Sequence, residues 1–351
     1  MTTRADLSPI EWPQCGMTGN MPEVNVIQDA VALACRAPSV HNSQPWKWVA
    51  DGSALHLFAD RRRLVPTIDS TGREMILSCG AALDHLRIAM AAVGWDTSVA
   101  RFPDRADAGH LAAVEFSPSS DVDAAQRRRA EAIHRRRTDR LPLAAPRGWA
   151  ALESRLRDFV DGHAVMLAVV ADDARAQLAE ASRLTEEIRR QDPTYQSELR
   201  WWTSPFGLDQ GVPPSSRVSA SEADRVDVAR TFPTTGYGQR RAEVGADHAK
   251  IIVLSTSPDP PDAGPEVLRC GEVLSTVLLE CTAAGLATCT LTHMTEIAPS
   301  RRLIGELTGQ RGLPQLLIRV GQPPAAGEHP RATPRRPVGE VFSFRNSPRP
   351  G

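Results

Sequence analysis

The chain has 351 residues, with 41 lysines and arginines against 42 aspartates and glutamates, and a formal net charge of −1. This balance gives no overall electrostatic case for nucleic acid or a membrane surface as the partner. The length suffices for one large domain or for two ordinary ones, with ample chain for a sizeable core.

The cysteines indicate the compartment. They show neither a CxxC pair nor metal-ligand spacing, and stand at positions 15, 35, 79, 270, 281 and 289. We therefore expect free thiols, a reducing compartment and no metal site. No basic-then-apolar leader is present, and no apolar run approaches the length of a membrane span. The sequence predicts a cytoplasmic protein with a disordered N-terminal extension over residues 1–20.

The first half of the chain reads as two helices and three strands. Pro38 ends the first helix, because proline lacks the N–H that a helix needs. Asp51-Gly52 is a strong hairpin signal, and Gly94 ends the second helix. In chain order the predicted elements are a helix with apolar positions from Val24 to Cys35, strands over 46–50 and 55–59, a helix over 72–93 and a strand over 111–117.

The loop between the first helix and the hairpin is rich in hydrogen-bonding side chains. Between Pro38 and Pro45 stand Ser39, His41, Asn42, Ser43 and Gln44. On its residues alone, the loop suits a helix end whose side chains satisfy their own backbone. It is equally suited to bind a planar polar heterocycle through these hydrogen-bonding side chains.

The second half mixes helices and strands without strict alternation, which indicates an α+β fold. Between residues 193 and 245 lies a segment rich in proline and aromatic residues, and insertions of this length are usually lids or binding loops. The predicted elements are helices over 149–160 and 172–190, strands over 164–170 and 250–255, a long helix around Cys270, and strands over 286–293 and 315–320.

The two long helices resemble each other. A shift of 191 residues aligns Cys79-Gly80 with Cys270-Gly271, and both helices end at a glycine that precedes a strand. An internal repeat would explain this match. Two ordinary helices rich in alanine and leucine would explain it as well.

Basic residues concentrate at one point near the middle of the chain. Arg135, Arg136 and Arg137 are followed by Thr138 and Arg140. Such a run suits either a solvated helix end or a phosphate site, since guanidinium groups bind phosphate oxygens in pairs.

The loop sequence Pro38-Ser-x-x-Asn-x-Gln-Pro-Trp46 resembles the flavin-contacting loop of the FMN-dependent nitroreductase superfamily. Its wider context from Arg36 is similar to the Acg-type branch, and the resemblance extends over about residues 21–342. It implies a nitroreductase-like α+β fold and FMN as cofactor. NAD(P)H would pass hydride to the flavin N5, which would then reduce a nitro-aromatic or a quinone. The flavin carries the chemistry, so no catalytic side chain is expected.

The same resemblance assigns candidate cofactor-binding residues. Loop residues Pro38, Ser39, His41, Asn42 and Gln44 would contact the ring and ribityl chain. The phosphate would lie against Arg135, Arg136, Arg137, Thr138, Arg140, Arg335 and Arg336. The stretch 285–293 is similar to the segment beside the flavin ring and would contribute Thr290, Thr292 and His293. Relatives often carry glutamate and glycine where this chain has Thr292 and His293.

Superfamily members are homodimers that build each FMN site from both subunits. Here the loop occurs only in the first half and the arginine motif only in the second. We therefore expect two fused nitroreductase-like halves, over 21–130 and 131–345, that mimic the homodimer. One FMN per chain and a monomer follow from this arrangement.

Two alternatives stay open. A lid over 193–245 could close over the flavin and leave a flavin-sequestering protein with little or no NAD(P)H-driven turnover. A degenerate fold that binds no flavin could instead serve as an interaction surface.

Overall fold

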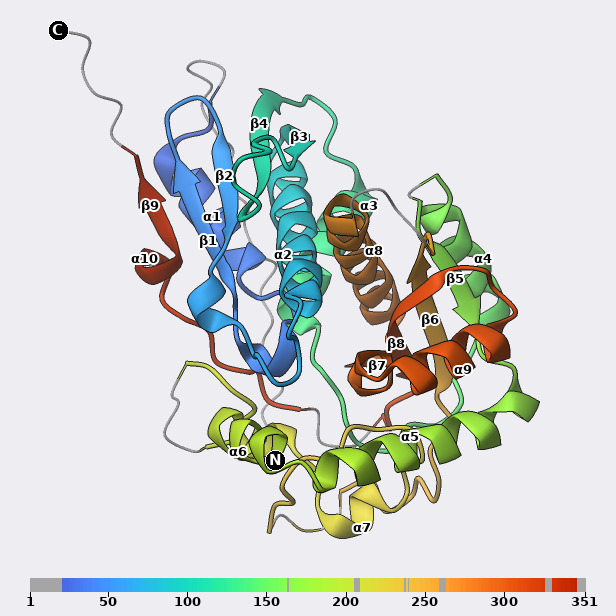
Figure 1. Cartoon of the computed structure of the whole chain (residues 1–351). Coiled ribbons are helices and arrows are strands. Elements are labelled where there is room, and N and C mark those ends of the chain that lie inside the picture. Colours follow the sequence, from blue (N-terminus) through green and yellow to red (C-terminus); the bar gives the residue numbers. More distant parts are fainter. Residues whose placement is uncertain are drawn as a thin grey trace, which may run out of the picture.

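The structure is a computed structural model, and it describes residues 21–162, 164–204, 209–236, 238, 240–258, 263–325 and 330–345. The predicted extension over 1–20, Cys15, Phe206 and Tyr237 lie outside the described residues. Two sheets stand on either side of a central pair of long helices, α2 and α8 (Figure 1).

The first sheet has five strands in the order β3-β4-β2-β1-β9. Neighbours pair antiparallel except β9, which comes from the C-terminal end of the chain and lies parallel to β1. The elements here are α1 (Val24–Ala34), β1 (Trp46–Ala50), β2 (Leu55–Ala59), α2 (Arg73–Ala92), β3 (Trp95–Arg101), β4 (His110–Pro118), α3 (Ala124–Arg135) and β9 (Phe342–Phe344).

The second sheet has four antiparallel strands in the order β5-β6-β8-β7. The remaining elements are α4 (Trp149–Val160), β5 (Met166–Val169), α5 (Arg175–Arg190), α6 (Pro193–Trp202), α7 (Ala220–Ala223), β6 (Lys250–Thr256), α8 (Ala263–Ala283), β7 (Ala287–Leu291), α9 (Ala298–Thr308), β8 (Leu313–Gly321) and α10 (Val338–Val341).

The two halves repeat one topology. The order β3-β4-β2-β1 corresponds, strand for strand, to β7-β8-β6-β5. In each half a helix precedes the first strand, and a long helix separates the second strand from the third. Each half also has its own apolar core between its helices and its sheet. The strand orders confirm the prediction of an α+β fold with two similar halves.

The long helices α2 and α8 touch through their glycines. A Cβ on Gly80 would lie 2.1 Å from the Leu268 carbonyl oxygen, and one on Gly271 would lie 2.2 Å from that of Leu77. The shift of 191 residues turns the first contact into the second, so the helices cross about a local two-fold axis. The sequence match between the two helices therefore reflects a shared packing requirement for a residue without a side chain.

Several elements were not predicted from the sequence, among them β3, α3 and α9. Strand β3 alternates polar and apolar residues weakly, and every second residue along it is exposed. Helix α3 is rich in arginine, and its start is a capping box between Asp123 and Gln126. Helix α9 begins after Ile297 with a proline near its N-terminus. In each case the apolar periodicity is too sparse to stand out.

The largest difference between the halves lies between β5 and β6. The equivalent strands β1 and β2 are joined by the short turn at Gly52, whereas residues 170–249 separate β5 from β6. This insertion contains α5, α6 and α7 and includes the predicted segment 193–245. Its apolar side chains pack across onto Val65 and Ile68 of the first half, and are those of Tyr195, Leu199, Trp202, Val212 and Phe232.

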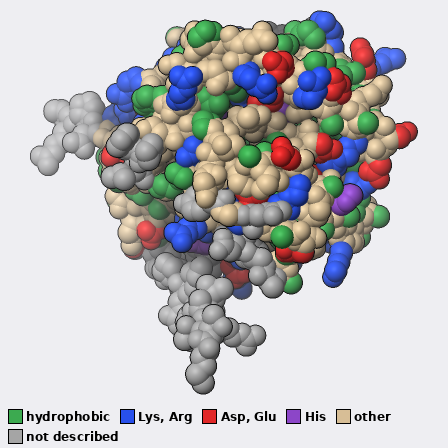
Figure 2. Space-filling view, turned by 90° about the horizontal axis from the view of Figure 1, so that it is seen from below, with side chains coloured by type: hydrophobic (Ala, Val, Ile, Leu, Met, Phe, Trp, Pro, Cys, Tyr) green, Lys and Arg blue, Asp and Glu red, His purple; other side chains and the backbone are tan. Residues whose placement is uncertain are grey.

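Among the described residues, α2 is long and apolar enough to cross a membrane, contrary to the expectation from sequence that no segment is. However, 78% of its apolar window is buried within the protein, because α2 is a central core helix. On the face seen from below, basic and acidic side chains are interspersed (Figure 2), as the near-neutral composition leads one to expect.

The glycine contact gives a stability prediction. We expect Gly80→Ala and Gly271→Ala each to lower the free energy of unfolding by about 1–3 kcal/mol or more, because the new methyl group must push the helices apart. Chemical denaturation measures this. The matched control is Gly305→Ala in α9, whose Cβ would meet only Pro314 Cγ, at 4.0 Å. The control should be neutral or slightly stabilising. Equal effects at all three positions would contradict the close approach.

Candidate functional site

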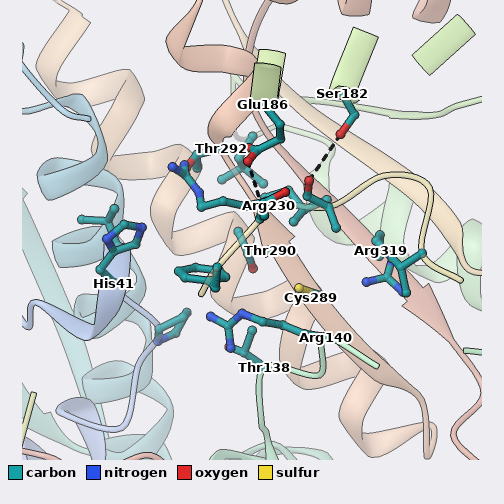
Figure 3. Close-up of a pocket in the computed structure, with 18 of the residues that line it drawn as sticks. His41, Thr138, Arg140, Ser182, Glu186, Arg230, Cys289, Thr290, Thr292 and Arg319 are labelled. Atoms are coloured by element: carbon teal, nitrogen blue, oxygen red, sulfur yellow. Dashed lines mark hydrogen bonds between the residues drawn. The ribbon is translucent and has the colours of Figure 1, made fainter. Parts of the chain in front are cut away.

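A cavity of about 300 Å³ lies where the two halves and the insertion meet. This volume is at the lower end of the range for small-molecule sites. Figure 3 shows His41, Thr138, Arg140, Thr290 and Thr292 around it, together with Arg230 from the insertion. Of the sequence-predicted site residues, the structure brings seven into its wall: Pro38, Ser39, His41, Thr138, Arg140, Thr290 and Thr292.

The loop after α1 adopts an unusual backbone. His41, Asn42 and Gln44 have φ angles of 47°, 57° and 52°, a left-handed conformation that costs a non-glycine residue of order 1–3 kcal/mol. The Ser39 hydroxyl holds the turn by accepting a hydrogen bond from the Gln44 N–H at 3.0 Å. Such strain is concentrated at functional sites, because the surrounding structure must impose it.

Two of the predicted loop residues hold the C-terminal segment instead of lining the cavity. Asn42 Nδ2 donates to the Pro334 carbonyl at 3.1 Å, and Gln44 Oε1 accepts from the Arg336 N–H at 2.9 Å. Gln44 Nε2 also donates to the Asp209 carbonyl of the insertion at 2.7 Å. Both amides thus fasten distant parts of the chain to the loop.

Four arginines gather beside the loop, and we call Arg36, Arg136, Arg137 and Arg335 the arginine cluster. Arg136 Nη2 and Arg335 Nη2 both donate to the Arg36 carbonyl, at 3.3 and 3.0 Å. Arg335 further donates to the carbonyls of Cys35 and Ala37. Pro38 and Thr138, which follow Ala37 and Arg137 in the chain, line the cavity.

Among the residues that the structure describes, no acidic side chain neutralises the arginine cluster. Within the described part of the chain, none of its four guanidinium groups forms an ion pair with an acidic side chain. Burial and the neighbouring guanidinium groups lower the pKa of Arg136 to about 9 and that of Arg335 to about 10. A partly buried group of like charges without a counter-charge among the described residues is suited to bind an anion with several oxygens.

Three other predicted residues lie elsewhere. Arg135 is exposed at the end of α3. Arg336 pairs its guanidinium with Glu340 at 3.3 Å, outside the arginine cluster. His293 is buried behind the cavity, with its Nε2 2.9 Å from the Ser182 hydroxyl. Conversely, Arg36 joins the cluster although the sequence motif gave it no phosphate role.

Two acidic side chains lie within hydrogen-bonding distance of Thr292 in the cavity wall. The Thr292 hydroxyl lies 3.0 Å from Glu74 Oε2 and 3.2 Å from Glu296 Oε1. Arg230 Nη2 donates to that hydroxyl at 3.1 Å and also pairs with Glu296. Sequence reasoning missed Glu74, Glu296 and Arg230. A single acid near a helix start looks like ordinary dipole compensation, so no local pattern marks them.

Two titratable groups in the cavity wall, Glu74 and His41, have strongly shifted pKa values. Burial and the nearby Glu296 raise the pKa of Glu74 to about 8. Burial, with the charges of Arg230 and Arg140, moves the pKa of His41 well below its usual value. The neutral His41 ring packs edge-on against Phe232 at 5.5 Å, and neither ring nitrogen has a partner among the described residues. Its nitrogens are therefore available to a ligand.

Metal chemistry has no candidate centre in the parts of the chain that the structure describes. No group of three or more histidine, cysteine, aspartate or glutamate side chains there is arranged to hold an ion. The five described cysteines, at positions 35, 79, 270, 281 and 289, are buried free thiols.

Comparison with known proteins gives two strong similarities over the whole chain. Uncharacterized protein Rv3127 of Mycobacterium tuberculosis H37Rv is 54% identical over 330 residues, covering 93% of this chain and 95% of its own. The protein named "Putative NAD(P)H nitroreductase acg" from the same strain is 51% identical over 329 residues, covering 94% of this chain and 98% of its own.

A solved structure is also similar. The FMN-dependent nitroreductase NfnB from Mycobacterium smegmatis, in complex with NADPH, aligns with a TM-score of 0.37 and 17% identity. The alignment covers 64% of this chain and all of that one. No protein-family model matches the sequence.

The raised pKa of Glu74 predicts a pH dependence of stability. The folded protein keeps a proton on this carboxyl up to about pH 8, whereas the unfolded chain loses it near the ordinary value of 4.5. This contribution to the free energy of unfolding is therefore full below pH 4.5 and falls as pH rises to 8, by at most about 1.4 kcal/mol per pH unit.

We expect Glu74→Gln to remove this fall, as measured by urea denaturation from pH 4 to 9. The control is Asp84→Asn, which removes another buried carboxyl of α2. Burial raises the pKa of Asp84 to about 6, so above that pH the profile of this control should run parallel to that of the unsubstituted protein. A Glu74→Gln profile that runs parallel to the unsubstituted protein between pH 6 and 8 would contradict the assignment.

Proposed function

The chain belongs to the Acg-type branch of the FMN-dependent nitroreductase superfamily, and on this premise we propose that it binds FMN and acts as an NAD(P)H-dependent flavin oxidoreductase. The acceptors would be nitro-aromatics or quinones. The alignments with the relatives that carry nitroreductase names cover nearly the full length of those relatives and of this chain. The similarity is therefore not confined to one part of the protein.

The observation that carries the proposal is the arginine cluster without a counter-charge. It draws Arg36 and Arg335 from opposite ends of the chain to Arg136 and Arg137, which follow α3. A phosphate dianion would neutralise part of this charge and accept charge-assisted hydrogen bonds from the guanidinium groups. The phosphate end of FMN is the part of the cofactor that this cluster fits.

The polar groups of the cavity wall support binding of the rest of the cofactor there. The wall offers hydroxyls at Ser39, Thr138 and Thr290, and the unpartnered nitrogens of His41, to a polar planar ring. When bound, FMN would accept hydride from NAD(P)H and pass the electrons to the acceptor. The protein's part is to hold the cofactor, shape the acceptor site and limit access of water.

The paired halves support one site per chain. The loop at residues 38–44 comes from the first half, the strand end at Thr290–Thr292 comes from the second, and the arginine cluster lies where they meet. A single chain would then do what two subunits do in the homodimers, as a monomer with one FMN. The buried free thiols are in keeping with a location in the cytoplasm.

A second candidate function is flavin sequestration with little turnover. The observation that favours it is the insertion, which supplies part of the cavity wall through α5 and through residues 218–234. Its apolar cluster, which includes Trp202 and Phe232, packs onto the first half. If the insertion acts as a lid, it would keep nicotinamide away from a bound flavin and slow the loss of the cofactor.

Cofactor binding is tested with FMN and riboflavin, which differ only in the phosphate. We expect one FMN per chain, measured by absorbance after gel filtration of a monomeric protein. Replacing Arg136 and Arg137 by methionine should weaken FMN binding at least about 100-fold, since charge-assisted hydrogen bonds contribute about 1.5–3 kcal/mol each. Riboflavin affinity should be unchanged.

Arg128→Met, on the exposed face of α3, is the matched control and should leave both affinities unchanged. Equal losses for FMN and riboflavin in the double variant would overturn the phosphate assignment. Two flavins per chain would overturn the single-site arrangement.

Turnover and sequestration are separated by anaerobic mixing with NADPH or NADH. Rapid loss of the oxidised flavin absorbance is expected of the oxidoreductase. If the insertion excludes nicotinamide, the unsubstituted protein should react slowly and Trp202→Ala should react faster, because that change loosens the packing of the insertion. A slow reaction in both proteins would rule out the lid as the cause.

A further inference from the structure

A second cavity is lined by Glu296, which accepts a hydrogen bond from Thr292 in the wall of the first cavity. It has a volume of about 750 Å³ and lies between the start of α2, α9 and the start of β8. Glu74 and Thr292 line the first cavity, whereas Glu296 lines the second. The two carboxyl groups and the threonine hydroxyl therefore span the wall between the cavities.

The three groups form a continuous hydrogen-bonded path. The Thr292 hydroxyl is within 3.2 Å of an oxygen of each carboxyl group, and it can accept from one side while it donates to the other. Glu296 forms ion pairs with Arg230 and Arg189, so it carries a proton only in passing. A proton that Glu296 takes up from the second cavity can pass to Thr292 while the Thr292 proton passes to Glu74. One O–H bond breaks and one forms at each step, so the hydroxyl is restored once its own rotation is complete.

We propose that Glu74 is the acid that protonates the electron acceptor in the first cavity, and that Thr292 and Glu296 return a proton to it from the second cavity. This inference rests on the proposed oxidoreductase function. A quinone that takes up one hydride needs one further proton to leave as the hydroquinone. A nitro group that takes up one hydride needs one further proton to break an N–O bond and release water.

Glu74 is suited to this role because it lines the first cavity and is hydrogen-bonded to Thr292. It is 2% exposed, and its two oxygens contact Arg73 at 3.0 Å and the Thr292 hydroxyl. The charged groups that act on it from the surrounding elements are Asp69 and Arg73 beside it, Arg230 from the insertion, and Glu296 and Arg301 after β7. Burial and Glu296 outweigh the arginines, and the pKa of Glu74 is raised.

One other carboxyl group of the cavity wall competes for the role. Burial raises the pKa of Glu186 as well, and its Oε2 accepts from the Thr231 N–H at 2.9 Å. No hydrogen bond among the described residues connects Glu186 to the second cavity. After giving up a proton it would have to recover one through the first cavity, which the acceptor occupies. Glu74 avoids this difficulty, because it can regain its proton through Thr292 while the acceptor occupies the first cavity.

The first test needs no cofactor. Infrared spectra of the full chain at pH 7 should show a protonated-carboxyl C=O band that is missing in Glu74→Gln and that disappears as pH rises past about 8. Asp84→Asn should keep this band, because Asp84 lies further along α2 and loses its proton near pH 6. Absence of any difference between the unsubstituted protein and Glu74→Gln would overturn the inference, whatever the fate of the FMN proposal.

The second test uses the FMN-loaded chain, reduced and then mixed with a quinone. Glu74→Gln should slow acceptor reduction by about 100-fold or more, the usual contribution of a general acid, while FMN content stays unchanged. The unsubstituted protein should lose rate above about pH 8, and the variant should show no such dependence. A Glu186→Gln variant that slows the reaction while Glu74→Gln does not would assign the proton to Glu186 instead.

The relay itself is tested at Thr292. Thr292→Val should keep the first turnover and slow later ones, because Glu74 can give up its proton once and is then recharged slowly. Thr292→Ser should restore the later turnovers, since the hydroxyl is retained. Equal rates in the valine and serine variants would overturn the path through Thr292. A chain that takes up no FMN would refute the proposed function and leave the infrared result to decide the state of Glu74.

Discussion

The close crossing of α2 and α8 is the contact on which the rest of the structure depends. Gly80 and Gly271 allow the two helix backbones to touch, and this contact joins halves that each have a separate core. It also brings the first turn of α2, with Glu74, to the end of β7 in the other half. A bulkier residue at the crossing would separate the walls of the cavity as well as the helices.

In the described part of the chain, the positive charge of the arginine cluster is not neutralised by acidic side chains. Other buried arginines are matched with acids: Arg319 pairs with Asp247, and Arg241 with Asp139. The guanidinium groups of the cluster instead donate to backbone carbonyls. Its charge would be neutralised by an anionic ligand, so ligand binding and stability should be coupled in this protein.

The insertion shows how one of two similar halves can be specialised. In the first half a short turn connects β1 to β2. In the second half a long segment connects β5 to β6 and forms part of the cavity wall. It supplies Arg230, which neutralises Glu296, and Phe232, which packs on His41. Residues that shape the cavity wall therefore come from the insertion, which has no counterpart in the first half.

The sequence alone determined the elements with strong periodicity, the repeated helix, the loop after Pro38 and the arginine run. Each of these is a local pattern, formed by residues that are close together in the sequence. It could not decide that Arg335 enters the cluster while Arg135 and Arg336 stay outside it. Nor could it join Glu74 to Glu296 through Thr292. Burial and proximity to other charges decide both, and these arise only when distant segments pack together.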